Sequence, residues 1–152
     1  MRRTKARVTL CSVFLIAILA FIWGNSLLPG EVSGAFSDWV KEILSLFLPG
    51  LGMERSGGGL LRKLAHFTEF AALGALLSWL FGMLDKQKAY ALVCGAAAAC
   101  IDETIQLFVP DRGPSVKDVC IDSAGVLTGI ILLWIGHDYC KKRSARLSLE
   151  DK

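Results

Sequence analysis

The feature that most constrains this chain is its division into long apolar blocks, separated by more polar segments. Four blocks are each close to the roughly 20 residues that an α-helix needs to cross a bilayer. We therefore predict one all-α domain over residues 1–152, an integral membrane bundle of four transmembrane helices. Only 20% of the residues are charged, which argues against a disordered chain. The predicted spans are residues 8–28, 60–84, 89–109 and 118–139.

The first block follows four basic residues within positions 1–7, as the apolar core of a signal peptide does. Its apolar run of about 20 residues is longer than such a core and fits a span. No clean small-residue cleavage site follows it. We expect an uncleaved helix that ends at Pro29-Gly30.

A short amphipathic helix is predicted over residues 36–48, in the long loop before the second span. Apolar side chains recur there at helical spacing, from Phe36 through Trp39 and Ile43 to Phe47. Polar residues fill the other face of this segment. Such a helix is expected to lie in the membrane interface.

The positions of the basic residues predict the orientation in the cell membrane. Eleven of the 17 Lys and Arg residues lie in the two chain ends and in the turn at 85–88, which four spans place on one side. By the positive-inside rule this side is cytoplasmic. Both termini are therefore predicted to be cytoplasmic, and the amphipathic helix and the loop at 110–117 extracytoplasmic.

The five cysteines are odd in number and form no C-x-x-C pair. Most lie in or beside apolar runs, so we expect buried thiols rather than a disulfide framework. The basic residues at the chain ends adjoin apolar blocks, which argues for membrane lipids and against nucleic acid as a partner.

Ionisable and amide residues of three spans should converge at the outer end of the bundle. The second span begins at that end, the third ends there and the fourth begins there. At 1.5 Å per residue, Glu69 and Glu103 both lie about 10–14 Å below the interface. A carboxylate that faces lipid at a helix centre costs about 2.5–3.5 kcal/mol, so these groups must face one another, a basic residue or water. The converging residues are Lys63, His66, Glu69, Asp102, Glu103, Gln106, Asp118 and Asp122.

This cluster has a structural and a functional interpretation. Ion pairs within it would hold three helices together, but eight such groups exceed what this requires. His66 beside a carboxylate suits a general base. The same groups are compatible with a hard divalent ion, although no spacing such as H-E-x-x-H indicates a metal site, and no cofactor is predicted. The catalytic candidates are His66, Glu69, Asp102 and Glu103.

Small residues predict where helices pack closely. Gly125 and Gly129 form a G-x-x-x-G face, and Gly95 with Ala99 forms a similar one. We expect these faces to make contacts within the bundle rather than a dimer seam, although an oligomer is compatible with the sequence. Adjacent helical residues point about 100° apart, so only one of the neighbours Asp102 and Glu103 is expected to face the centre fully.

Two stretches of the chain resemble the VanZ-like family of small bacterial membrane proteins. The first is Lys-Leu-Ala-His-Phe-Thr-Glu-Phe at 63–70, followed by Leu73-Gly74. The second runs from Asp102-Glu103 to Gly129, and together they cover about half of the chain. The sequence departs from the family pattern at Phe70, Asp111 and Asp122, where Tyr, Gly and Asn are usual, and Asp122 adds a buried acid.

The resemblance implies a cell-envelope protein of Gram-positive-type bacteria. The family's namesake is associated with low-level resistance to teicoplanin, a lipid-tailed glycopeptide. With Asp122 added from the cluster, the ligand-binding candidates are the motif positions Lys63, His66, Glu69, Asp102, Glu103, Gln106, Arg112, Ser115 and Asp118.

Three functions are open at this point. In the first, the outer cluster binds a lipid-linked envelope precursor or a lipoglycopeptide and confers tolerance, with Arg112 and Lys117 contacting phosphate or carboxylate groups. In the second, the protein is an intramembrane enzyme that acts on an envelope lipid or polymer precursor, using the imidazole and carboxylates of the cluster. The third is a transporter, for which the chain lacks the inverted repeats and broken helices typical of that class.

Overall fold

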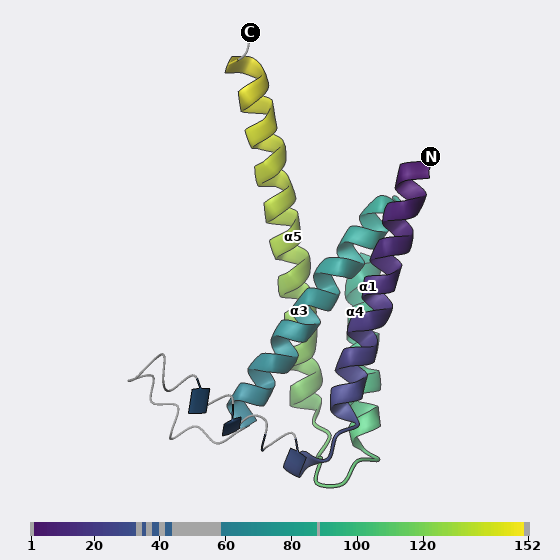
Figure 1. Ribbon diagram of the computed structural model, residues 1–152, viewed down its shortest axis with the longest axis vertical. Helices are drawn as coiled ribbons and strands as arrows, with labels where there is room; N and C mark the ends of the chain where they lie inside the picture. The colour runs from purple at the N-terminus through teal and green to yellow at the C-terminus, as the bar shows by residue number, and fades with distance from the viewer. Residues whose placement is uncertain are drawn as a thin grey trace.

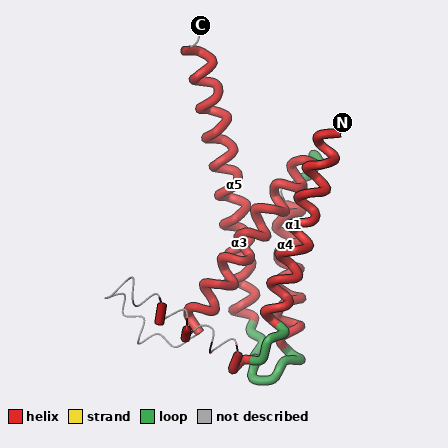
Figure 2. Tube along the Cα trace, in the orientation of Figure 1, coloured by secondary structure: helices red, strands yellow, loops and turns green. Residues whose placement is uncertain are grey.

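The fold was taken from a computed structural model, which describes residues 2–32, 35, 38–39, 42–43, 59–87 and 89–150. Within these residues the chain is helical apart from short connections, and it contains no strand (Figure 2). The all-α prediction is confirmed. The long helices are α1 (Arg2–Ser26), α3 (Gly59–Met83), α4 (Ala89–Gln106) and α5 (Val116–Glu150).

The four long helices run alternately in opposite directions (Figure 1). α1 and α4 run away from the end of the bundle that carries the N-terminus, and α3 and α5 run back toward it. The two chain ends and the turn between α3 and α4 therefore lie toward one end. The loop between α4 and α5 lies at the opposite end, which we call the loop end.

The turn between α3 and α4 is fixed by the way in which α3 stops. The N–H of Lys86 donates to the carbonyl of Phe81 (2.9 Å), and that of Asp85 donates to Gly82 (3.3 Å). Asp85 itself adopts a left-handed backbone with φ of 55°. This pattern is a Schellman C-cap, and it lets α4 start within a few residues of the end of α3.

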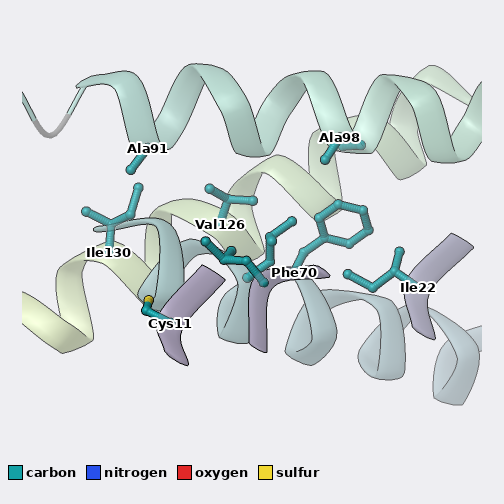
Figure 3. Close-up of a cluster of buried hydrophobic side chains, with 10 residues drawn as sticks. Cys11, Ile22, Phe70, Ala91, Ala98, Val126 and Ile130 are labelled. Carbon is teal, nitrogen blue, oxygen red and sulfur yellow. The ribbon is translucent and has the colours of Figure 1, made fainter. Parts of the chain in front are cut away.

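The apolar core lies between the four helices and receives side chains from each of them (Figure 3). Ile22 of α1, Phe70 of α3 and Val126 of α5 are completely buried. α4 contributes alanines, including Ala91 and Ala98. Because these side chains are small, the backbone of α4 can lie close to its neighbours.

α3 and α5 make the closest helix contact of the bundle. A Cβ atom added at Gly74, Gly125 or Gly129 would collide with a backbone carbonyl of the facing helix. A Cβ at Gly95 of α4 would instead collide with the side chain of Val126. The prediction that these small residues pack within the bundle is confirmed.

Three helical segments are long and apolar enough to cross a membrane: Thr4–Ser26, Leu60–Met83 and Val116–Ser144. Only 17–28% of each apolar window is buried inside the protein, so most of this apolar surface faces outward, as lipid contact requires. These segments correspond to the first, second and fourth predicted spans. α4, which corresponds to the third, is not among them, and a four-span arrangement stays a prediction.

Two expectations about the rest of the chain have different outcomes. The amphipathic helix expected over 36–48 lies mostly outside the described residues; positions 38–39 and 42–43 are described and are helical. The expectation of buried thiols is wrong for most of the cysteines. Cys11 is buried, whereas Cys94, Cys100, Cys120 and Cys140 are exposed on the outside of the helices, where a thiol can face lipid like any small apolar group.

Candidate functional site

A narrow pocket at the loop end is built by α3, α4 and α5. Its volume of about 10 Å³ is about what one water molecule or one small ion requires. The convergence of three helices at one end, predicted from the sequence, is thus present as geometry. The pocket is lined by Arg62, Lys63, His66, Glu103, Gln106, Asp118, Ile121 and Asp122.

The side-chain amide of Gln106 lies at the centre of the polar groups of α4. Its Nε2 donates to Oδ2 of Asp102 (3.0 Å) and lies 3.2 Å from Oε1 of Glu103. The same nitrogen lies 3.4 Å from Oγ of Ser26 at the end of α1. Asp102 and Glu103 are both buried, and one amide contacts both carboxylates. The expectation that only one of them faces the centre fully stays a prediction.

Glu103 also fastens the loop that leads into α5. Its Oε2 accepts a hydrogen bond of 2.8 Å from the backbone N–H of Ser115. The hydroxyl of Ser115 accepts from the N–H of Lys117 (3.2 Å), which is the usual N-cap interaction two residues into a helix. Ser115, a predicted ligand-binding residue, therefore starts α5 and positions Asp118 on its first turn.

His66 lies between the polar and apolar parts of the bundle. Its Nδ1 is 3.7 Å from Oδ2 of Asp102, which is too long for a hydrogen bond and becomes an ion pair when the imidazole is protonated. The ring stacks on Phe70, with centroids 6.5 Å apart. Because Phe70 is completely buried and His66 lines the pocket, His66 lies where the pocket meets the apolar core.

Lys63 and Asp118 form an ion pair at the mouth of the pocket. Lys63 Nζ lies 2.7 Å from Oδ1 of Asp118, and the side chains are 40% and 20% exposed. The pair joins the first turns of α3 and α5. Its partial exposure lets solvent screen the attraction, so it contributes modestly to stability.

Glu69 lies deeper on α3, and the end of α1 provides its partner. The amide Nδ2 of Asn25 donates to Oε1 of Glu69 at 3.4 Å. Its other oxygen, Oε2, is buried without a hydrogen-bond partner among the described residues. Glu69 is not among the residues that line the pocket. Glu69, although a predicted site residue, therefore lies behind the pocket and faces α1.

Arg112 holds the loop end to the end of α1 rather than lining the pocket. Its Nε donates to the carbonyl of Leu28 (3.2 Å) and its Nη2 to that of Asn25 (3.1 Å). Burial is the main cause that lowers the pKa of this guanidinium, which nevertheless stays charged at neutral pH. The carbonyl of Leu28 follows the end of α1, and that of Asn25 also accepts from the N–H of Leu28 (3.2 Å). Arg112 thus adds polar contacts at the C-terminus of α1.

Two carboxylates next to His66 are buried but incompletely paired. Asp102 is 0% exposed and Asp122 is 2% exposed. Oδ1 of Asp102 and Oδ2 of Asp122 have no hydrogen-bond partner among the described residues. One ligand atom each from His66, Asp102 and Asp122 lie within 4.8 Å of one another. The arrangement can hold a cation, and it also provides an imidazole beside a carboxylate.

Two residues of the site were missed by reasoning from the sequence. Arg62 lines the pocket. Its spacing of four residues from His66 places both side chains on one helix face. This spacing could have identified Arg62, but Lys63 was chosen as the basic candidate on α3. Ser26 is completely buried beside Gln106. A hydroxyl at the end of an apolar span, next to Asn25, is weak evidence by itself, so only the packing of α1 identifies it.

Comparison with known proteins gives one positive result. A family model described as VanZ/LLP1 matches residues 11–137, which include α3, α4, the loop end and the first part of α5. The matched range also contains every residue that lines the pocket. Neither the curated proteins nor the solved structures give a match.

Proposed function

Because the chain belongs to the VanZ/LLP1 family, as its motifs predicted, we propose that this envelope protein confers tolerance to glycopeptides of the teicoplanin type. It does so through the pocket at the loop end, which binds a polar group of a lipoglycopeptide or of a lipid-linked envelope precursor. The observation that carries the proposal is the pocket itself. Three helices direct charged side chains into one place within an otherwise apolar bundle.

The proposal includes four membrane spans with both termini in the cytoplasm. The alternating directions of α1, α3, α4 and α5 support this arrangement (Figure 1). The 18 residues of α4 extend about 27 Å, close to the roughly 30 Å of a hydrocarbon core. Most of the basic residues lie at the end with the termini, which is the cytoplasmic end by the positive-inside rule. The pocket then opens toward the outer leaflet.

The charges at the mouth suit a ligand that carries both signs. Arg62 and Lys63 stand at the start of α3, and Asp118 stands opposite them on α5. Guanidinium and ammonium groups bind phosphate and carboxylate oxygens, and a carboxylate such as that of Asp118 binds a cationic group. The volume of about 10 Å³ admits a single group rather than a whole molecule, so the rest of the ligand lies in the outer leaflet.

The alternative of an intramembrane enzyme has no separate observation in its favour. Among the described residues, no hydrogen bond joins His66 to a serine or cysteine that could serve as a nucleophile. Binding is the simpler function for the same groups, and we propose only binding.

The test is teicoplanin susceptibility of a sensitive Gram-positive host that expresses the protein. Wild type is compared with His66→Gln in the pocket and with His137→Gln on the exposed, distal part of α5. We expect raised tolerance with wild type and His137→Gln, and loss of it with His66→Gln at equal membrane abundance. Unchanged susceptibility with wild type refutes the tolerance, and tolerance that survives His66→Gln refutes the pocket as its site.

Orientation is tested with reporters fused after residue 150. A fluorescent protein that folds in the cytoplasm should be bright there, whereas alkaline phosphatase, which folds outside, should be inactive. A cysteine introduced at Gly113 of the loop end, in a chain whose native cysteines are replaced, should react with an impermeant maleimide on intact cells. Active phosphatase at the C-terminus contradicts the proposed topology.

A further inference from the structure

We propose that His66, Asp102 and Asp122 bind one divalent transition-metal ion, of the class of Zn²⁺ or Mn²⁺, at the inner end of the pocket. This inference deepens the proposed function, since the ion would offer a coordination position to the polar group that the pocket binds. In that respect it rests on the proposed function. Its own evidence is the geometry of these three side chains.

The three side chains lie close enough together to share one ion. They come from α3, α4 and α5, and each offers a ligand atom within 4.8 Å of the other two. An ion about 2.0–2.2 Å from nitrogen and oxygen ligands needs them about 3–4 Å apart. Nδ1 of His66 and Oδ2 of Asp102 are already 3.7 Å apart. Small rotations of these side chains therefore bring all three to one ion.

Within the described part of the chain, two carboxylate oxygens of these ligands lack hydrogen-bond partners. Oδ2 of Asp122 and Oδ1 of Asp102 have no hydrogen-bond donor among the described residues, although both side chains are almost completely buried. A buried carboxylate without a donor is costly in any apolar surrounding. Asp122 lines the pocket, and one of its ligand atoms lies within 4.8 Å of ligand atoms of His66 and Asp102. A bound cation is the missing partner for both oxygens.

Carboxylates outnumber the basic groups around the pocket. Asp122 lies within electrostatic range of four further carboxylates, those of Glu69, Asp102, Glu103 and Asp118. Among the described residues, Arg62, Lys63 and Arg112 lie near them, and Lys117 is on the first turn of α5. If all of these groups are ionised, five carboxylates face four basic groups, and a bound cation offsets the remaining negative charge.

The ligand atoms indicate the kind of ion. One imidazole nitrogen with two carboxylate oxygens is a mixed ligand set, which suits zinc, manganese or iron better than calcium, which prefers oxygen ligands alone. Three protein ligands leave a further position for water or for an oxygen of a bound molecule. The volume of about 10 Å³ accommodates one such ion.

The test measures metal bound to the purified full-length protein in detergent, without any cellular phenotype. The protein is stripped with a chelator, incubated with Zn²⁺ or Mn²⁺, desalted and analysed by mass spectrometry of the elements, and affinities are obtained by competition with a chromophoric chelator. We expect about one ion per chain. Loss of a ligand should weaken binding at least as much as loss of a supporting residue, by about 10–100-fold or more.

Matched variants separate the proposed ligands from other sites. His66→Gln and Asp122→Asn should weaken binding, whereas His137→Gln and Asp138→Asn, which make the same changes on the distal part of α5, should not. Circular dichroism and gel filtration check that each variant is folded. Added Zn²⁺ or Mn²⁺ should raise the Tm of wild type and of the two control variants by ligand linkage, but not that of Asp122→Asn.

Absence of bound metal in wild type overturns the inference, because the carboxylates must then be neutralised by protons. Equal affinity in all four variants also overturns it, since the ion would then lie elsewhere. Binding of Ca²⁺ without Zn²⁺ or Mn²⁺ overturns the role of the imidazole. A protein that binds the ion but confers no tolerance refutes the proposed function alone, and tolerance without a bound ion refutes this inference alone.

Discussion

The carboxylate of Glu103 accepts a hydrogen bond of 2.8 Å from the backbone N–H of Ser115, twelve residues further along the chain. This bond connects the last turn of α4 to the residue that caps α5. The orientation of α5, and with it the place of Asp118 and Asp122, depends on how the loop between them is held. Glu103 is thus a positioning residue for the pocket as well as part of its wall.

Glu103→Ala should lower the free energy of unfolding by about 1–3 kcal/mol, because the Ser115 N–H loses a charged acceptor. Glu103→Gln keeps an acceptor oxygen and should lose less. Thermal unfolding in detergent measures both. Thr104→Ala, at the exposed neighbouring position, is the control and should unfold near the wild-type temperature. An unaltered Tm in Glu103→Ala would show that the bond does not hold the loop.

Gly129→Ala should destabilise the bundle by about 1–3 kcal/mol or more, because its Cβ would collide with the carbonyl of Ala71 on α3 and overpacking has a cost of this order. Gly136→Ala, two turns further along α5 with nothing within 4 Å, should instead be neutral or stabilise by up to about 1 kcal/mol through helix propensity. Unfolding in detergent compares the two variants. Equal effects at both positions would mean that the helices can separate without loss.

Arg112→Lys should destabilise the protein by about 1.5–3 kcal/mol, because a single ammonium group cannot replace both charged hydrogen bonds to the carbonyls of Leu28 and Asn25. The matched control is Arg146→Lys on exposed helix surface, which should change stability by no more than about 0.5 kcal/mol. The measurement is again the unfolding midpoint in detergent. Equal stability of the two variants would contradict the role of Arg112 in holding the loop end to α1.

The ion pair of Lys63 with Asp118 should show a coupling energy of about 0.2–1 kcal/mol in a double-mutant cycle of Lys63→Met and Asp118→Asn. The coupling should fall as salt is added, since both side chains are partly exposed. The pair Lys142–Asp138, at 3.9 Å with side chains 78% and 49% exposed, should give a smaller value. A coupling that is larger for the exposed pair would contradict this account.

The long helices could be predicted from the sequence because the apolar blocks are unbroken and end at clear signals. Pro29 follows α1, and the turn after Met83 follows α3. The fourth span was predicted to end at residue 139, whereas α5 continues through residues 140–150, which are rich in basic residues. They continue the helix, because Lys, Arg, Ala and Leu are all good helix formers.

Most residues of the candidate site could be predicted from the sequence, but the hydrogen bonds between them could not. That Lys63, His66, Asp102 and Asp118 lie at one end follows from the directions of the spans. That Gln106 lies between Asp102 and Glu103, or that Ser26 completes its contacts, depends on side-chain rotation and on the packing of α1. The spacing of apolar residues in the sequence indicates neither the side-chain rotamers nor the packing of α1. Arg112 shows the same limit, because a basic loop residue can serve a ligand or the backbone equally well.

The length of α5 has a consequence beyond the bundle. Its 35 residues extend about 52 Å, whereas a bilayer with its headgroups is about 40–45 Å thick. On the proposed topology, Lys141, Lys142 and Arg143 then reach the depth of the anionic headgroups of the inner leaflet. Residues 144–150 continue α5 beyond that depth as a helix.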